Sequence, residues 1–118
     1  MPLDWTSGAL AEGLCCYRKS EFFLAHEHWE SVWLKLEEPE KSFLQALIQT
    51  AAAFHHLRSG NSVGAASLLQ RSLRRLELSP ESFGNIATGP LCSQIREWLR
   101  VLENGTQPHP ATVPHIQD

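Results

Sequence analysis

The chain has 118 residues, of which 42% are hydrophobic and 19% charged, and these proportions are typical of one domain with a single core. Its formal net charge of -3 provides no basic field for a phosphate backbone, so nucleic acid is excluded as the expected partner. The three cysteines include two adjacent ones and form no disulfide framework, which predicts reduced thiols in a cytoplasmic protein.

The first half of the chain contains two predicted helices. One covers residues 6–19, where the apolar residues recur at helical spacing. The next covers residues 20–37, with Ser20 as its N-cap, and ends before Pro39, because the residue preceding a proline disfavours the helical conformation.

A third helix is predicted over residues 40–58, and Gly60 can adopt the left-handed conformation that closes it. Its long uncharged run is interrupted by glutamines and histidines and is too short for a membrane span, so no membrane partner is expected. Asn61 is predicted to cap a fourth helix over residues 62–78.

The remainder is predicted to be a loop over residues 79–90, a last helix that starts at Gly89–Pro90 and ends near Glu103, and a proline-containing tail. We find no convincing strand. The sequence therefore predicts an all-α, single-domain bundle of about five helices with short connections. The domain is expected to cover residues 1–105 and the tail residues 106–118.

The second predicted helix concentrates polar and aromatic side chains in the segment AHEHWE, residues 25–30. Glu30 follows His26 by one helical turn and can contact its imidazole, whereas His28 points to the solvated side. Glu27 is expected at the edge of the same face. A helical wheel groups four side chains on one side: Phe22, His26, Trp29 and Trp33.

A His26–Glu30 pair on this face has two readings. A carboxylate beside two tryptophans needs a partner, because burying it alone is costly, and the imidazole supplies one. Such a pair suits general acid–base chemistry, and both groups are also metal ligands. The same pair can instead hold two helices in register.

The third predicted helix is apolar almost all round except for one narrow, uncharged polar stripe. This stripe runs at spacings of four, three and four through Gln45, Gln49, Ala52 and His56. Charged residues would normally occupy a solvent-facing stripe, so we expect it to face an enclosed pocket that His26 and Glu30 complete.

Two segments, FFLAHEHWESVW at residues 22–33 and FLQALIQTAAAFHHLRSGN at residues 43–61, resemble the domain of unknown function 309 family. The family pattern is F-x-x-H-E-x-W-E-x-x-W, then L-I-Q-x-A-A-A and H-x-x-x-G-N, and the resemblance extends over about residues 10–78. It implies an all-helical bundle and assigns no biochemical function. The residues that fit the pattern are Phe23, His26, Glu27, Trp29, Glu30, Trp33, Gln45, Gln49, His56, Gly60 and Asn61.

The first functional hypothesis is a hydrolase-like or small-ligand-binding protein. Its candidate catalytic residues are His26, Glu27, Glu30 and His56, and its candidate ligand-binding residues are Gln45, Gln49, Trp29 and Trp33. A bound divalent metal would need His26, Glu30 and His56 to converge, since the H-E-x-x-H pattern of zinc hydrolases is incomplete.

The second hypothesis is a non-catalytic interaction domain that docks on a partner protein or on a second copy of itself. The His/Glu cluster is then structural. Neither hypothesis names a substrate, a cofactor or an oligomeric state.

Overall fold

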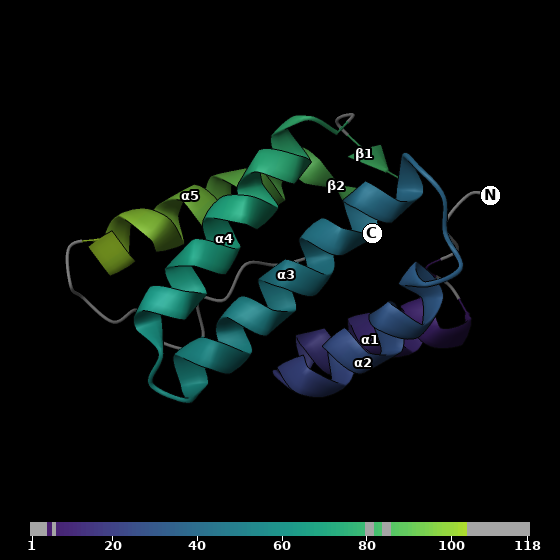
Figure 1. Ribbon diagram of the computed structural model, residues 1–118, viewed down its shortest axis with the longest axis horizontal. Helices are drawn as coiled ribbons and strands as arrows, with labels where there is room; N and C mark the ends of the chain where they lie inside the picture. Colours follow the sequence, from purple (N-terminus) through teal and green to yellow (C-terminus); the bar gives the residue numbers. More distant parts are fainter. Residues whose placement is uncertain (1–4, 6, 80–81, 84–85, 104–118) are drawn as a thin grey trace.

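The computed structural model describes residues 5, 7–79, 82–83 and 86–103, and it is a bundle of helices (Figure 1). The elements are α1 (Gly8–Arg18), α2 (Phe22–Trp33), α3 (Glu40–Arg58), α4 (Ser62–Glu77), β1 (Ser82–Phe83), β2 (Ile86–Ala87) and α5 (Thr88–Glu103). The predicted all-α bundle of five helices is confirmed. The predicted tail, residues 106–118, lies outside the described residues.

The loop predicted before the last helix contains a short antiparallel ladder, in which Ser82 pairs with Ala87 and Phe83 with Ile86. The prediction of no strand was therefore wrong at this point. Strands of two residues are too short to show the apolar–polar alternation by which a strand is recognised, and the proline, glycine and asparagine of the segment indicate only a turn.

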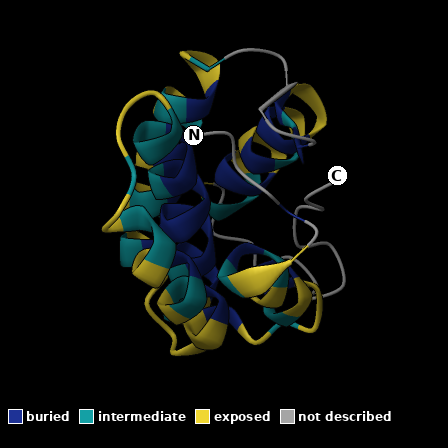
Figure 2. Ribbon diagram, turned by 90° about the vertical axis from the view of Figure 1, so that its right-hand side faces the viewer, coloured by how far each residue is buried: buried dark blue, intermediate teal, exposed yellow. Residues whose placement is uncertain are grey.

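Helix α3 is the centre of the fold. It packs between α2 and α4, while α1 covers α2 and α5 packs on α4 (Figure 1). Figure 2 shows the buried residues on the sides of the helices that face one another. Phe54 of α3 contacts both α2 and α5. Its ring centroid lies 5.6 Å from that of Phe22 on α2 and 4.9 Å from that of Trp98 on α5. Within the described residues, no helix combines the length and apolar character needed to cross a membrane.

Helices α1 and α3 end in the same way, with a residue in the left-handed conformation. After α3 this residue is Gly60, with φ of 86°, as predicted. After α1 it is Ser20, with φ of 63°, and the amides of Ser20 and Glu21 donate to carbonyl oxygens of the last turn of α1. This pairing is a Schellman motif. Ser20 therefore terminates the first helix, and its predicted role as N-cap of the second helix was wrong.

Helix α2 is shorter than predicted, because it ends at Trp33 and not near Glu37. Beyond it the amides of Lys35 and Leu36 donate to carbonyl groups three residues earlier, which closes the helix with a tighter turn. The start of α4 was predicted correctly, since the Asn61 side chain accepts a hydrogen bond from the Gly64 amide at 2.9 Å.

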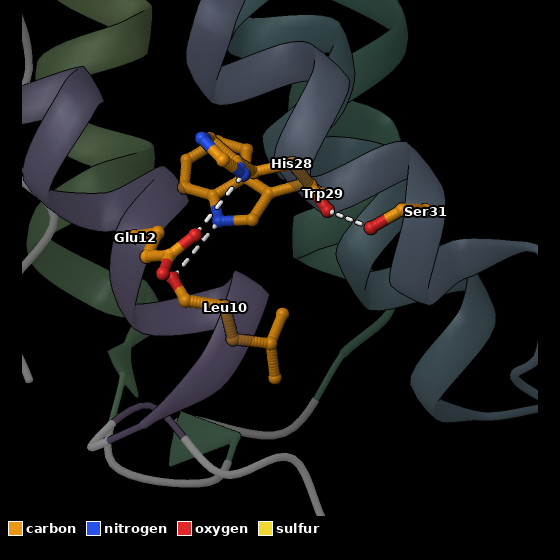
Figure 3. Close-up of polar contacts among 5 residues, drawn as sticks. All are labelled: Leu10, Glu12, His28, Trp29 and Ser31. Atoms are coloured by element: carbon orange, nitrogen blue, oxygen red, sulfur yellow. Dashed lines mark hydrogen bonds and ion pairs between the residues drawn. The ribbon is translucent and has the colours of Figure 1, made fainter.

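Trp29 fixes the position of α2 on α1 (Figure 3). Its indole is fully buried, and its Nε1 donates to the Leu10 carbonyl oxygen at 3.2 Å. Gly13 makes room for the ring, because a Cβ atom there would lie 2.3 Å from Trp29 Nε1. Trp29, one of the candidate ligand-binding residues, thus lies in the α1–α2 core.

Candidate functional site

Two rows of side chains border each other where α2 packs on α3, and we call them together the α2–α3 seam. The seam comprises Phe23, His26, Glu30 and Trp33 on α2, and Gln45, Gln49, Ala52 and His55 on α3. At one end the Phe23 ring lies 5.4 Å from that of His55, and at the other end Trp33 and Gln45 line one pocket. These two points show that α2 and α3 run antiparallel along the seam. Of the residues expected to line one enclosed pocket, Gln45 and Trp33 line the pocket at this end, whereas His26, Glu30 and Gln49 are not among its lining residues.

The predicted His26–Glu30 pair is formed, with His26 Nε2 at 3.2 Å from Glu30 Oε2. The two side chains are 27% and 49% exposed, so the pair lies at the outer edge of the seam. The expectation of a carboxylate buried beside the tryptophans was wrong, because Trp29 turns toward α1 and leaves Glu30 on the solvent side. Phe23 stacks on the imidazole, with 6.2 Å between ring centroids.

Three polar atoms of the seam are buried and have no hydrogen-bonding partner among the described residues. They are His26 Nδ1, Trp33 Nε1 and Gln49 Oε1. Polar atoms in such positions are usually hydrogen-bonded, so each of the three is a point at which a ligand or a water molecule can bind. The indole N–H can only donate, the amide oxygen can only accept, and the imidazole nitrogen does either according to its tautomer.

A pocket of about 280 Å³ opens at the Trp33 end of the seam. Its lining residues are Trp33, Glu38, Lys41, Ser42, Gln45 and Arg75. The Lys41 ammonium lies 4.5 Å from the centroid of the Trp33 ring, a cation–π contact that holds both groups at the rim. Arg75 comes from α4, so three helices or their flanks build this pocket.

Glu38 is held within the pocket by Ser42, whose hydroxyl donates to Oε2 at 2.5 Å and whose amide donates to Oε1 at 2.7 Å. These hydrogen bonds lower the pKa of the Glu38 carboxyl, and the charges of Arg75 and Lys41 lower it further. Sequence reasoning missed Glu38, Lys41 and Arg75. Glu38 could have been found, because an acidic residue just before a predicted helix with a serine in its first turn often contacts that serine. No feature of the sequence places Arg75 in the pocket.

Two further polar residues of α2, His28 and Glu27, are not part of the seam. His28 was predicted to face solvent, but it is half-buried and its Nδ1 lies 3.4 Å from Glu12 Oε2 of α1 (Figure 3). Glu27 is exposed, and its place at the edge of the site stays a prediction.

His56 lies in the last turns of α3, where its Nδ1 is 3.3 Å from Nδ2 of Asn61 in the turn that follows the helix. The part of the chain that the structure describes holds no group of three or more His, Cys, Asp or Glu side chains arranged to bind a metal. The predicted convergence of His26, Glu30 and His56 is therefore not present. His56 is the last residue of the polar stripe on α3, and its side chain contacts Asn61 in the turn that follows the helix.

The motifs that build the seam also identify the family. The sequence model described as Domain of unknown function (DUF309) matches residues 10–68, which is half of the chain and runs from α1 into α4. The chain belongs to the DUF309 family. No curated protein matches it. In this DUF309 protein the matched span contains the whole seam and every pocket residue except Arg75.

Proposed function

We propose that this DUF309 protein binds a small molecule in the α2–α3 seam and its adjoining pocket. One observation carries the proposal: three buried polar atoms of the seam, His26 Nδ1, Trp33 Nε1 and Gln49 Oε1, have no partner among the described residues. A site that is built to hydrogen-bond a ligand has such atoms before the ligand arrives.

The chemistry of the three atoms specifies the ligand's polar groups. Trp33 Nε1 requires an acceptor and Gln49 Oε1 requires a donor, so the ligand must offer both. Glu30 orients the imidazole of His26 through Nε2, which leaves Nδ1 as the nitrogen that meets the ligand. Gln45 lines the pocket one turn before Gln49 and provides a further amide.

Binding fits this arrangement better than catalysis. Nε2 of His26 is held by Glu30, and Nδ1 has no partner among the described residues, so no second acid or base is positioned beside it for proton transfer. The hydrolase-like role is therefore not included in the proposal. The interaction-domain hypothesis stays a prediction, and the exposed Leu24 and Leu34 of the α2 region are its available contacts.

The substitution Gln49→Leu tests the proposal. It replaces an unsatisfied buried acceptor by an apolar side chain of similar size, so the melting temperature of the free protein is expected to stay the same or rise. A thermal-shift screen with amides, nucleosides, carboxylates and phosphate esters is expected to find compounds that stabilise the wild type and not the variant. Gln70→Leu, at an exposed position of α4, is the matched control.

The opposite result would identify the cluster as structural. If Gln49→Leu lowers the stability of the free protein by about 1–3 kcal/mol, the amide is already satisfied without a ligand. If in addition no compound shifts the melting temperature of the wild type, the polar side chains of the seam serve only to pack α2 on α3, and the binding proposal is wrong.

A further inference from the structure

The pocket at the end of the seam contains two cations that form no salt bridge. Lys41 and Arg75 both line it, yet neither has a carboxylate within 4.0 Å among the described residues. Lys41 is instead placed over the Trp33 ring. Two cations from different helices that line one pocket attract an anion that enters it.

Glu38, the carboxylate of the pocket, interacts with both cations, but its single negative charge balances only one of their two positive charges. Both of its oxygens accept from Ser42, and that contact occupies the amide in the first turn of α3. With two cations against one ionised carboxylate, the pocket keeps a positive excess. An entering cation would meet Lys41 and Arg75, whereas an entering anion would be attracted to both.

We infer that the ligand of the seam carries an anionic group, a carboxylate or a phosphate, and that this group binds between Lys41 and Arg75. The inference rests on the proposed function and specifies the chemistry at the open end of the site. An anion oxygen is also the acceptor that Trp33 Nε1 lacks. The volume of about 280 Å³ lies just below the range of about 300–1,000 Å³ typical of drug-sized ligands, so the molecule is small.

The test is a calorimetric titration of the full chain at constant ionic strength. The probes are inorganic phosphate, glycerol 3-phosphate, succinate and calcium chloride. Saturable binding of either phosphate probe or of succinate is expected, and which of them binds identifies the source of the charge. Binding of calcium without either anion class would overturn the inference.

Three variants separate a built site from general charge attraction. Arg75→Gln is expected to weaken anion binding about tenfold or more, since a hydrogen bond to a charged group is lost. Arg74→Gln makes the same charge change at an exposed position of the same helix and is expected to have little effect. Glu38→Gln retains an acceptor for Ser42 and removes the repelling charge, so anions are expected to bind severalfold more tightly.

The outcomes for the two proposals differ. If Arg75→Gln and Arg74→Gln weaken binding equally, or if neither anion class binds, the inference of an anion site is wrong. If neutral compounds then still bind in a manner that depends on Gln49, the seam proposal stands alone. If anions bind through Arg75 but Gln49→Leu leaves their affinity unchanged, the anion site stands and the seam proposal fails.

Discussion

The absence of a side chain at Gly13 determines whether α2 can dock on α1. Trp29 is fully buried there, stacked on Tyr17 with 6.1 Å between ring centroids, and its N–H is used by the Leu10 carbonyl. Gly13 is in the middle of α1, where glycine is unfavourable by about 1 kcal/mol relative to alanine. The indole therefore explains why a helix interior carries this residue.

We predict that Gly13→Ala destabilises the protein by about 1–3 kcal/mol, because the new methyl group overlaps the indole and the overlap outweighs the gain in helix propensity. Gly89→Ala is the matched control, since nothing lies within 4 Å of a Cβ atom at that position. Urea unfolding followed by circular dichroism measures both. Equal stabilities of the two variants would contradict this account of Gly13.

The ends of α1 and α3 show what a sequence can and cannot predict about an element. Gly60 was predicted correctly, because glycine is the residue that adopts a left-handed conformation most readily. Ser20 adopts the same conformation, but serine before an apolar run is also the usual sign of an N-cap. Only the hydrogen bonds of Ser20 and Glu21 back to α1 distinguish the two roles.

The first turn of α3 is expected to contribute a pH-dependent part of the stability. Because the pKa of Glu38 lies below its ordinary value of 4.5, the ionised form is favoured in the folded protein. The stabilisation from the ionised Glu38 carboxylate is complete at pH values above 4.5 and is lost as the pH falls through the lowered pKa of the folded protein.

We predict that the stability difference between wild type and Glu38→Gln shrinks or reverses as the pH falls from neutral to about 3, because protonation removes the advantage of the charge. Urea unfolding at a series of pH values provides the measurement, with Glu37→Gln as a control for the loss of a neighbouring exposed carboxylate. A difference that is independent of pH would show that Ser42 does not favour the charged form.

At the scale of the whole molecule, the helices pack in chain order, and Phe54 is the side chain that ties α2 to α5 across the central helix. The helices were predictable because each depends on the spacing of apolar residues within its own segment. The His26–Glu30 pair was predictable because its two residues are four apart on one helix. The pocket was not predictable, because Arg75 reaches it from another helix and Glu38 only through the turn before α3.

We predict that Phe54→Ala lowers the free energy of unfolding by about 3–5 kcal/mol, as expected for a large-to-small change in a core. Since Phe54 contacts both sides of the bundle, tryptophan fluorescence and far-ultraviolet circular dichroism are expected to report one common transition at the lower stability. Phe23→Ala, at a position that is 52% exposed, is expected to cost much less. Similar losses for the two variants would contradict the bridging role of Phe54.

The placement of the four tryptophans gives the protein an intrinsic optical sensor. Trp5, Trp29 and Trp98 are buried in the core, whereas Trp33 is partly exposed and forms a wall of the pocket. A molecule that enters the pocket changes the surroundings of this fluorophore and leaves those of the other three largely unaltered. Emission from unlabelled protein thus reports occupancy, and a Trp33→Phe variant provides the blank.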